Sequence, residues 1–433
     1  MTPSARLSAA IEVLADVDAR RRPAPDVLKD WGLSHRFAGS SDRAAIAGLV
    51  YDALRRKASS AWLMGETTPR AALLGMLHRE RGLDAAAIAA LCSGQRFAPG
   101  PLTAPESAAL GSGTIADAPP YVQGEYPQWL DTHFARVFGD ERAEEGAALA
   151  SRAPLDMRVN TLKAEREELL SKLSHLGVEP TRWSPHGLRL RLAADARSPA
   201  IHAEPLFLKG FIEIQDEGSQ LAALLAGAKP GEQVVDLAAG AGGKTLALAA
   251  AMENRGQIFA TDIDERQLAP IHERIARAGA HNIQVRTPRG ETDVVADLAG
   301  RADLVLIDAP CTGTGTWRRN PDAKWRIRPG AVAERVKQQT VLLDRAVALT
   351  KPGGRIAYIT CSVLAEENND QVRAFTGRHG DFSVEKPAQM VQALGERAYL
   401  FSRAALISDE GLLMTPRRTD TDGFFISLLR RSS

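Results

Sequence analysis

The amino-acid sequence predicts an α/β protein in which an all-helical amino-terminal domain and a small α+β module precede a mostly parallel sheet. From about residue 216, short apolar runs alternate with helical segments, as in a doubly wound sheet. Residues 188–192 alternate apolar and basic side chains with the period of a strand, whereas residues 1–140 carry apolar side chains at helical spacing. We therefore expect domains over residues 1–140, 150–215 and 216–433.

Residues 1–140 are expected to form helices. Leu7, Ile11 and Leu14 recur at helical spacing, and a second apolar series over residues 46–54 follows Asp42, which suits a helix cap. Residues 111–120 are rich in Gly, Ser, Ala and Pro and predict a loop. Cys92 ends another predicted helix, where we interpret it as a small buried hydrophobic residue and not as a reactive thiol.

The segment 150–215 is expected to form the α+β module. Residues 157–159 and 211–214 are typical of strands, and residues 162–176 of a helix. Its arginines could line a sheet face that meets RNA, and a solvated strand face is an equally good interpretation; they are Arg182, Arg189, Arg191 and Arg197.

The large sheet is expected to take its strands from five apolar runs, with helices between them. The runs are 234–237, 258–262, 283–285, 304–308 and 355–360. Two further apolar runs, 412–414 and 424–429, are separated by polar turn residues and predict a terminal antiparallel hairpin.

Composition excludes several classes of protein. Three cysteines in 433 residues do not support a disulfide-rich secreted scaffold, and no Cys-x-x-Cys spacing supports a metal site. The chain shows no signal peptide and no apolar run of about 18 residues, so we expect a soluble, cytoplasmic monomer without a membrane partner. Because the net charge is only +1, nucleic-acid binding must rest on local clusters.

A glycine-rich loop follows the first strand of the large sheet. Residues 238–244 lead into an Ala/Leu-rich helix whose free N–H groups can meet a ligand. A phosphate-binding P-loop would need glycine at position 238, which is Ala238. A nucleoside-binding sheet needs an acid about 20 residues beyond the loop, and Asp262 satisfies that spacing. The spacing favours a nucleoside without separating nicotinamide from S-adenosylmethionine cofactors.

Two cysteines follow strands of this sheet. Cys311 ends Asp-Ala-Pro-Cys, Cys361 lies in Thr-Cys-Ser, and parallel strands would place both thiols at the ligand-binding edge. A thiolate that adds to carbon 6 of cytosine activates carbon 5 toward a sulfonium methyl donor, and a base must later remove the carbon 5 proton. Asp308 is suitably placed to protonate or hydrogen-bond ring nitrogen 3. Two inert buried cysteines would leave the strand-end placement unexplained.

Five motifs in order resemble the RNA cytosine-5 methyltransferases of the RsmB/Sun (NOL/NOP/Sun) type; they span residues 236–245, 262–266, 308–315, 318–325 and 358–363. The resemblance covers roughly residues 150–431, and the helical segment is similar, more weakly, to a NusB-like RNA-binding domain. It implies a Rossmann-like seven-stranded methyltransferase sheet with a C-terminal antiparallel hairpin, after an RRM-like module. It also implies S-adenosyl-L-methionine as cofactor and RNA as substrate, ribosomal RNA being favoured over transfer RNA. A non-catalytic RNA-binding assembly factor with this fold is the rival hypothesis.

The resemblance implies roles for particular residues. Cys361 is the expected nucleophile, and Cys311 is expected to help release the product. Lys244 and Asp308 are expected to contact the target base as well as the cofactor. The expected cofactor-binding residues are Ala238, Ala239, Gly240, Ala241, Gly242, Gly243, Lys244, Asp262 and Asp308.

The chain departs from the family pattern at the cofactor loop. The family usually has cysteine, alanine and proline where this chain has Ala238, Gly240 and Ala241, which should loosen the loop without abolishing binding. Residues 286–291 also lack the acid expected near Arg289, on the adenine side of the cofactor pocket.

A basic segment follows Cys311. Residues 316–337 contain seven basic and two acidic residues, with two interleaved tryptophans. Basic side chains neutralise phosphates and aromatic rings stack on unpaired bases, whereas the alternative is a solvated loop with core tryptophans. The expected RNA contacts are Arg318, Arg319, Lys324 and Trp325.

Overall fold

The computed structural model describes residues 1–191, 199–290 and 292–433, and these form two compact units. The helical unit joins residues 1–152 to residues 317–328, and the sheet unit joins residues 153–316 to residues 329–433. The α+β module and the large sheet, which the sequence suggests as separate domains, thus belong to one unit. Residues 317–328, which lie between two sheet-forming segments of the chain, belong to the helical unit.

Helices build the first unit, as the sequence predicts. Thr2 and Thr68 cap α1 and α5 by accepting the N–H groups of Ala5 and Ala71. One apolar face of each long helix packs into a shared core, in which Cys92 is buried as expected. The helices are α1 (Pro3–Arg20), α2 (Ala24–Ser34), α3 (Ser40–Arg55), α4 (Lys57–Met64), α5 (Pro69–Arg79), α6 (Ala85–Leu91), α7 (Ala104–Ser112), α8 (Pro120–Gln123), α9 (Asp131–Phe138), α10 (Arg142–Leu149) and α17 (Ala323–Arg326).

The α+β module is a four-stranded antiparallel sheet in the order β2-β3-β1-β4, with two short helices. These are β1 (Leu155–Val159), β2 (Glu179–Pro180), β3 (Gly187–Leu190), β4 (Ile212–Ile214), α11 (Arg166–Lys172) and α12 (Pro205–Leu208). The Asn160 side chain links the module to α16 (Ile271–Ala278) by donating hydrogen bonds to the carbonyls of Gly210, in the module, and Ala278.

The arginines of this module do not form one free face. Arg189 is 2 % exposed, and its guanidinium contacts the carboxylates of Asp156, Glu217 and Asp420. The proposed RNA-facing role is therefore wrong for Arg189, because its charge is already paired inside the protein. Arg197 lies outside the described residues.

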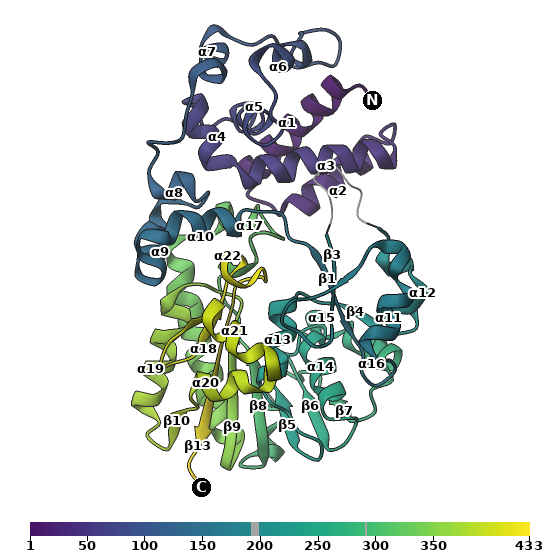
Figure 1. Ribbon diagram of the computed structural model, residues 1–433, viewed down its shortest axis with the longest axis vertical. Helices are drawn as coiled ribbons and strands as arrows, with labels where there is room; N and C mark the ends of the chain where they lie inside the picture. The colour runs from purple at the N-terminus through teal and green to yellow at the C-terminus, as the bar shows by residue number, and fades with distance from the viewer. Residues whose placement is uncertain (192–198, 291) are drawn as a thin grey trace. The chain divides into compact units, whose positions relative to one another are not determined.

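In the described part of the chain the large sheet has nine strands in the order β11-β12-β13-β9-β8-β5-β6-β7, with β10 paired to β13. Figure 1 shows β13, β9, β8, β5, β6 and β7 of this sheet in that order. Strands β9, β8, β5, β6 and β7 are parallel, and β13 is antiparallel to β9 and β12. The predicted parallel sheet and terminal hairpin are confirmed, while the short strands β10 and β11 were not predicted. The strands are β5 (Gln233–Asp236), β6 (Gln257–Ala260), β7 (Ile283–Val285), β8 (Ala302–Asp308), β9 (Thr350–Thr360), β10 (Phe382–Val384), β11 (Leu406–Ile407), β12 (Leu412–Met414) and β13 (Phe424–Arg431).

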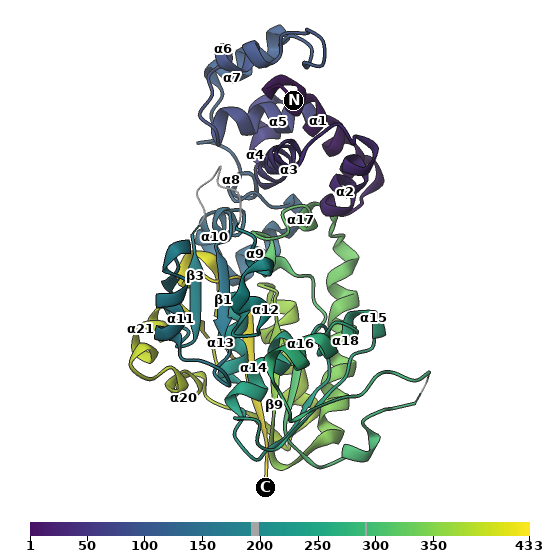
Figure 2. The same ribbon diagram turned by 90° about the vertical axis from the view of Figure 1, so that its right-hand side faces the viewer.

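Helices cover both faces of the sheet, and Figure 2 shows α18 on one side with α13, α14, α20 and α21 on the other. Apolar residues of the latter four helices pack against Val234, Leu304 and Ala357 of the central strands. The helices of this layer system are α13 (Glu217–Leu225), α14 (Gly243–Ala251), α15 (Glu265–Leu268), α16 (Ile271–Ala278), α18 (Pro329–Leu349), α19 (Asn369–Arg378), α20 (Pro387–Met390), α21 (Ala398–Ala404) and α22 (Pro416–Thr419).

Candidate active site

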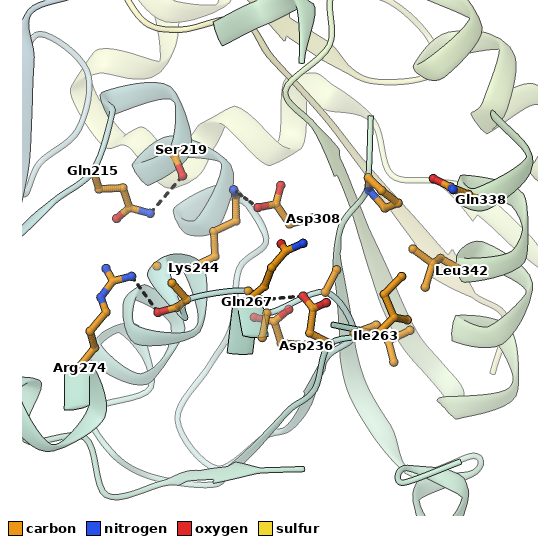
Figure 3. Close-up of a pocket in the computed structure, with 18 of the residues that line it drawn as sticks. Gln215, Ser219, Asp236, Lys244, Ile263, Gln267, Arg274, Asp308, Gln338 and Leu342 are labelled. Carbon is orange, nitrogen blue, oxygen red and sulfur yellow. Dashed lines mark hydrogen bonds and ion pairs between the residues drawn. The ribbon is translucent and has the colours of Figure 1, made fainter. Parts of the chain in front are cut away.

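A cavity of about 630 Å³ opens at the carboxyl ends of β5, β6 and β8 (Figure 3). This volume lies in the range of small-molecule sites, and the position is the one where open parallel sheets bind ligands. All but one of the predicted cofactor-binding residues line it: Ala238, Ala239, Gly240, Ala241, Gly243, Lys244, Asp262 and Asp308.

Gly242, the exception, shapes the loop instead. Its φ is +83°, and a Cβ atom there would lie 2.4 Å from Cγ1 of Ile271. The residue therefore lets the loop pass closely over α16, where a side chain would displace it. Gly242 is the second of the three glycines in the loop, and its positive φ together with the close approach of Ile271 accounts for a glycine at this position.

Asp262 is oriented by the backbone around it. Its Oδ2 accepts the N–H of Gly240 at 2.9 Å, and its Oδ1 accepts the N–H of Asp264 at 3.0 Å. The carboxylate thus ties the end of β6 to the glycine loop and presents its remaining lone pairs to the cavity. This is the geometry that ribose hydroxyls require.

Lys244 does not serve a phosphate loop. Its ammonium contacts Asp308 Oδ2 at 2.6 Å and lies 5.0 Å from the centre of the Phe424 ring. Asp236, Asp262 and Asp308 all line the cavity, and burial raises the pKa of Asp236 to about 7. The Asp262 and Asp308 carboxylates at the cavity wall can accept hydrogen bonds from the ribose hydroxyls and the amino group of a nucleoside cofactor.

The described residues fit S-adenosylmethionine at the other end of the cavity as well. Figure 3 shows Ile263, Leu342 and Gln338 together on the side away from Lys244. Ile263 is 78 % exposed, so its side chain offers an apolar surface on which an adenine ring would be held. Arg289 is not among the described residues that line the cavity, whereas Gln267 and Gln338 bring amide groups to it.

The two predicted thiols meet. Asp308 of β8 pairs with Ile359 of β9, and the Sγ atoms of Cys311 and Cys361 lie 3.2 Å apart beyond these strand ends. The hydrogen bond between the thiols, and then burial, raise the pKa of Cys311 well above its ordinary value. The expectation that both thiols emerge at one sheet edge is confirmed.

Two of the four predicted RNA contacts, Arg318 and Lys324, are buried within the helical unit. Arg318 and Lys324 are 1 % and 0 % exposed, and Lys324 Nζ donates to the Arg55 carbonyl. Trp325 Nε1 donates to the Leu54 carbonyl at 2.7 Å. The buried side chains of Arg318 and Lys324 therefore pack this unit and do not reach solvent, while RNA contact by the half-buried Arg319 and Trp325 stays a prediction.

Several residues of the site were missed from the sequence. Glu367 is fully buried and contacts both cysteine-bearing segments, and Gln339 joins it from α18. Arg274 donates to the Ala241 carbonyl and so supports the glycine loop. In the sequence, the acidic pair Glu366-Glu367 after Thr-Cys-Ser was the only sign of a polar group near Cys361. The sequence could not show that the Glu367 carboxylate points into the protein.

Two features are absent from residues 1–191, 199–290 and 292–433. No group of three or more His, Cys, Asp or Glu side chains there could hold a metal ion. No helix in those ranges is long and apolar enough to span a bilayer.

Comparisons with known proteins agree with this geometry. Residues 222–430 match the family described as 16S rRNA methyltransferase RsmB/F, and residues 126–197 match its ferredoxin-like domain. The chain is similar to the probable ribosomal RNA small subunit methyltransferase B of Synechocystis sp., at 31 % identity over 313 residues (72 % of this chain, 68 % of that protein). It is also similar to the protein of that name from Bacillus subtilis, at 32 % identity over 310 residues (71 % of this chain, 66 % of that protein).

Solved structures show the same architecture. The crystal structure of PH0851 superposes with a TM-score of 0.70 at 25 % identity, covering 100 % of this chain and 99 % of that one. A methyltransferase homolog protein from Pyrococcus horikoshii superposes with a TM-score of 0.58 at 28 % identity, covering 72 % and 97 % of the two chains. The cofactor cavity, the paired thiols and these matches together show that the chain belongs to the RsmB/F family of S-adenosylmethionine-dependent RNA methyltransferases.

Proposed function

We propose that this protein methylates carbon 5 of a cytosine in small-subunit ribosomal RNA, with Cys361 as nucleophile and Cys311 as the residue that releases the product. The observation that carries the proposal is the 3.2 Å contact of the two thiols at the sheet edge, where Asp308 and Pro310 also line the cofactor cavity. Ribosomal RNA is favoured because the relatives are named small-subunit ribosomal RNA methyltransferases.

The thiol pair suits the first step. Cys311 retains its proton, because the hydrogen bond with Cys361 and burial raise its pKa, and it can donate that proton toward Cys361 Sγ. Cys361 loses its own proton to solvent, and the resulting thiolate adds to carbon 6 of the base. Ring nitrogen 3 takes up a proton from solvent, and the ring becomes an enamine with electron density on carbon 5. When bound, S-adenosylmethionine supplies the electrophilic methyl group that carbon 5 takes.

Release needs a base, and the same pair can supply one. Once Cys361 Sγ is bonded to carbon 6 it is a thioether, a weaker hydrogen-bond acceptor than a thiolate, so the interaction that contributes most to the raised Cys311 pKa is weakened. Cys311 can then lose its proton to solvent and take the proton of carbon 5. The electron pair of that bond restores the ring double bond, and the bond from carbon 6 to Cys361 Sγ breaks.

Lys244 and Asp308 are placed to orient the base. Both side chains line the cavity, and Asp308, at 36 % exposed against 7 % for Lys244, is the more exposed member of the pair. A carboxyl group there can hydrogen-bond ring nitrogen 3 and stabilise the adduct.

Methyl transfer from labelled S-adenosylmethionine tests this function. The purified protein should label small-subunit ribosomal RNA, and digestion should place the label on 5-methylcytosine. Label on transfer RNA alone would replace the substrate assignment, and no label on ribosomal RNA, ribosomal particles or transfer RNA would favour the assembly-factor hypothesis. Mapping 5-methylcytosine in cells with and without the protein would identify the nucleotide.

A further inference from the structure

A buried carboxylate joins the two segments that carry the thiols. Glu367, at the end of the 3₁₀ turn Ala365–Glu367, is 0 % exposed. Its Oε1 accepts the backbone N–H of Thr312 at 2.8 Å, and its Oε2 accepts the hydroxyl hydrogen bonds of Thr312 and Ser362. Thr312 directly follows Cys311, and Ser362 directly follows Cys361. One side chain thus contacts both loops, one residue away from each sulfur.

Glu367 is itself held in place from several directions. Tyr358 Oη donates to its carbonyl at 2.6 Å, and the side chain of Asn368 donates to the Ser362 carbonyl at 2.8 Å. Gln339 Nε2, from α18, donates to Glu367 Oε1 at 3.1 Å and to the Pro310 carbonyl at 3.0 Å. These contacts fix the Glu367 carboxylate relative to the sheet and to α18. Through its own hydrogen bonds the carboxylate then fixes both cysteine loops relative to the same two elements.

We propose that Glu367 is a positioning residue that holds the sulfur atoms of Cys311 and Cys361 at their contact distance. The two thiols lie on separate loops, and no covalent link sets their spacing; Glu367 supplies a common acceptor for both. Its importance for methyl transfer rests on the proposed function, whereas its effect on thiol spacing does not.

The ionised form of Glu367 is the one that satisfies its surroundings. Burial raises the pKa of this carboxyl group, but all of its hydrogen-bond partners can donate and two are N–H groups that cannot accept. Removing the carboxylate would leave these N–H groups buried without an acceptor, and the loops would move to find one. An amide at the same place could keep one oxygen for the N–H donors, while the hydroxyl groups of Thr312 and Ser362 turn to accept from it.

A thiol–disulfide equilibrium measures the spacing without requiring activity. Oxidised glutathione takes two electrons from the thiol pair, giving the Cys311–Cys361 disulfide and two molecules of reduced glutathione. Mass spectrometry of the linked peptide, over a series of glutathione ratios, gives the effective concentration of one thiol at the other. Glu367→Ala should lower this concentration at least about tenfold, whereas Glu367→Gln should stay within about threefold of the wild type.

Glu125→Ala is the matched control. Glu125 is 1 % exposed in the helical unit, and its carboxylate also accepts backbone N–H groups, those of Ala58 and Ser59, and a hydroxyl. Its loss should cost stability of a similar size and leave the thiol equilibrium unchanged. Where Glu367→Ala does not fold, Thr312→Val removes one hydroxyl donor and should lower the effective concentration about threefold.

Methyl transfer supplies the second readout. In Glu367→Ala, kcat should fall about 100-fold, since misplacing a reacting group by about 1 Å has an effect of that order, while calorimetry should show cofactor affinity within about twofold of wild type. A wild-type thiol equilibrium in Glu367→Ala, or an equal shift in Glu125→Ala, would overturn the proposal. If the thiol equilibrium shifts as expected but the wild type methylates no RNA, the positioning role stands and the proposed function fails.

Discussion

At the scale of single residues, the two cysteines differ because their neighbours differ. Cys311 follows Pro310 at a sheet edge where the hydrogen bond between the two thiols, and then burial, raise its pKa, so Cys311 is the thiol that keeps its proton. When a pair of thiols shares a single proton, the thiol that keeps it can act as a proton donor and the other sulfur can act as the nucleophile. This asymmetry supports Cys361 as the nucleophile, in agreement with the role that Thr-Cys-Ser implies.

Alanine variants of the cysteines separate attack from release. Cys361→Ala should lower kcat roughly 10⁴-fold or more, because the covalent route is lost. Cys311→Ala should instead trap an enzyme–RNA adduct, since attack survives while removal of the carbon 5 proton fails. Denaturing electrophoresis with labelled RNA detects the adduct, and the buried Cys92→Ala is the control that should behave as wild type. An adduct with Cys361→Ala and none with Cys311→Ala would reverse the assignment.

At the scale of elements, the junction of β5 with α14 positions the cofactor loop. Gly240 and Gly242 both have positive φ, at +50° and +83°, but only at Gly242 would a Cβ atom meet a neighbouring side chain, that of Ile271. The two glycines therefore have different roles in the loop. Gly240 turns the chain and donates its N–H to the Asp262 carboxylate, whereas Gly242 lets the loop pack against α16.

The two glycines form a matched pair of variants. Gly240→Ala should lower the free energy of unfolding by about 1 kcal/mol, the order of cost for a left-handed backbone. Gly242→Ala should lower it by about 2–4 kcal/mol and weaken S-adenosylmethionine binding at least about tenfold, because the contact with Ile271 displaces the loop. Denaturant titration and calorimetry measure both effects. Equal losses for the two variants would show that the contact with Ile271 does not matter.

At the scale of the whole molecule, a segment from the middle of the chain completes the helical unit. Trp317 stacks on Phe134 with ring centres 5.9 Å apart, Arg55 donates to the Arg318 carbonyl, and burial lowers the pKa of Lys324 to about 7. The basic residues that resemble an RNA-binding stretch in the sequence are thus partly used to join residues 317–328 to residues 1–152.

Lys324 should make the stability of the helical unit depend on pH. Its pKa in the folded protein lies below that of a free lysine, so the unfolded chain binds the proton more tightly and stability falls as pH falls from about 10 to about 7. Lys324→Met should remove this dependence, which amounts to roughly 1–3 kcal/mol between pH 9 and pH 7. Denaturant titrations of both proteins at the two pH values measure it.

RNA affinity provides the companion measurement. If Lys324 only packs the helical unit, Lys324→Met should leave the salt dependence of RNA binding unchanged. A slope reduced by about one would show a phosphate contact and would reinstate its predicted RNA-binding role.

Local sequence by itself determined most of the sheet unit. Apolar runs of strand length, the glycine loop, Asp262 at its expected spacing and the terminal hairpin could all be predicted, because each depends on residues near one another in the chain. The strand-end rule then placed Cys311 and Cys361 at one edge, since parallel strands end together.

Only the tertiary structure decided which polar side chains turn inward. Arg189, Lys324 and Glu367 occur in segments that look solvent-facing, but partners 28 to 269 residues away bury the first two, and Glu367 turns back onto Thr312 and Ser362. A charged side chain can be buried only where other groups donate hydrogen bonds to it or accept them from it. These groups come from distant parts of the chain, so the spacing of residues in the sequence does not predict them. The sequence therefore determined the thiols and the cofactor loop, and the fold decided what holds the thiols together.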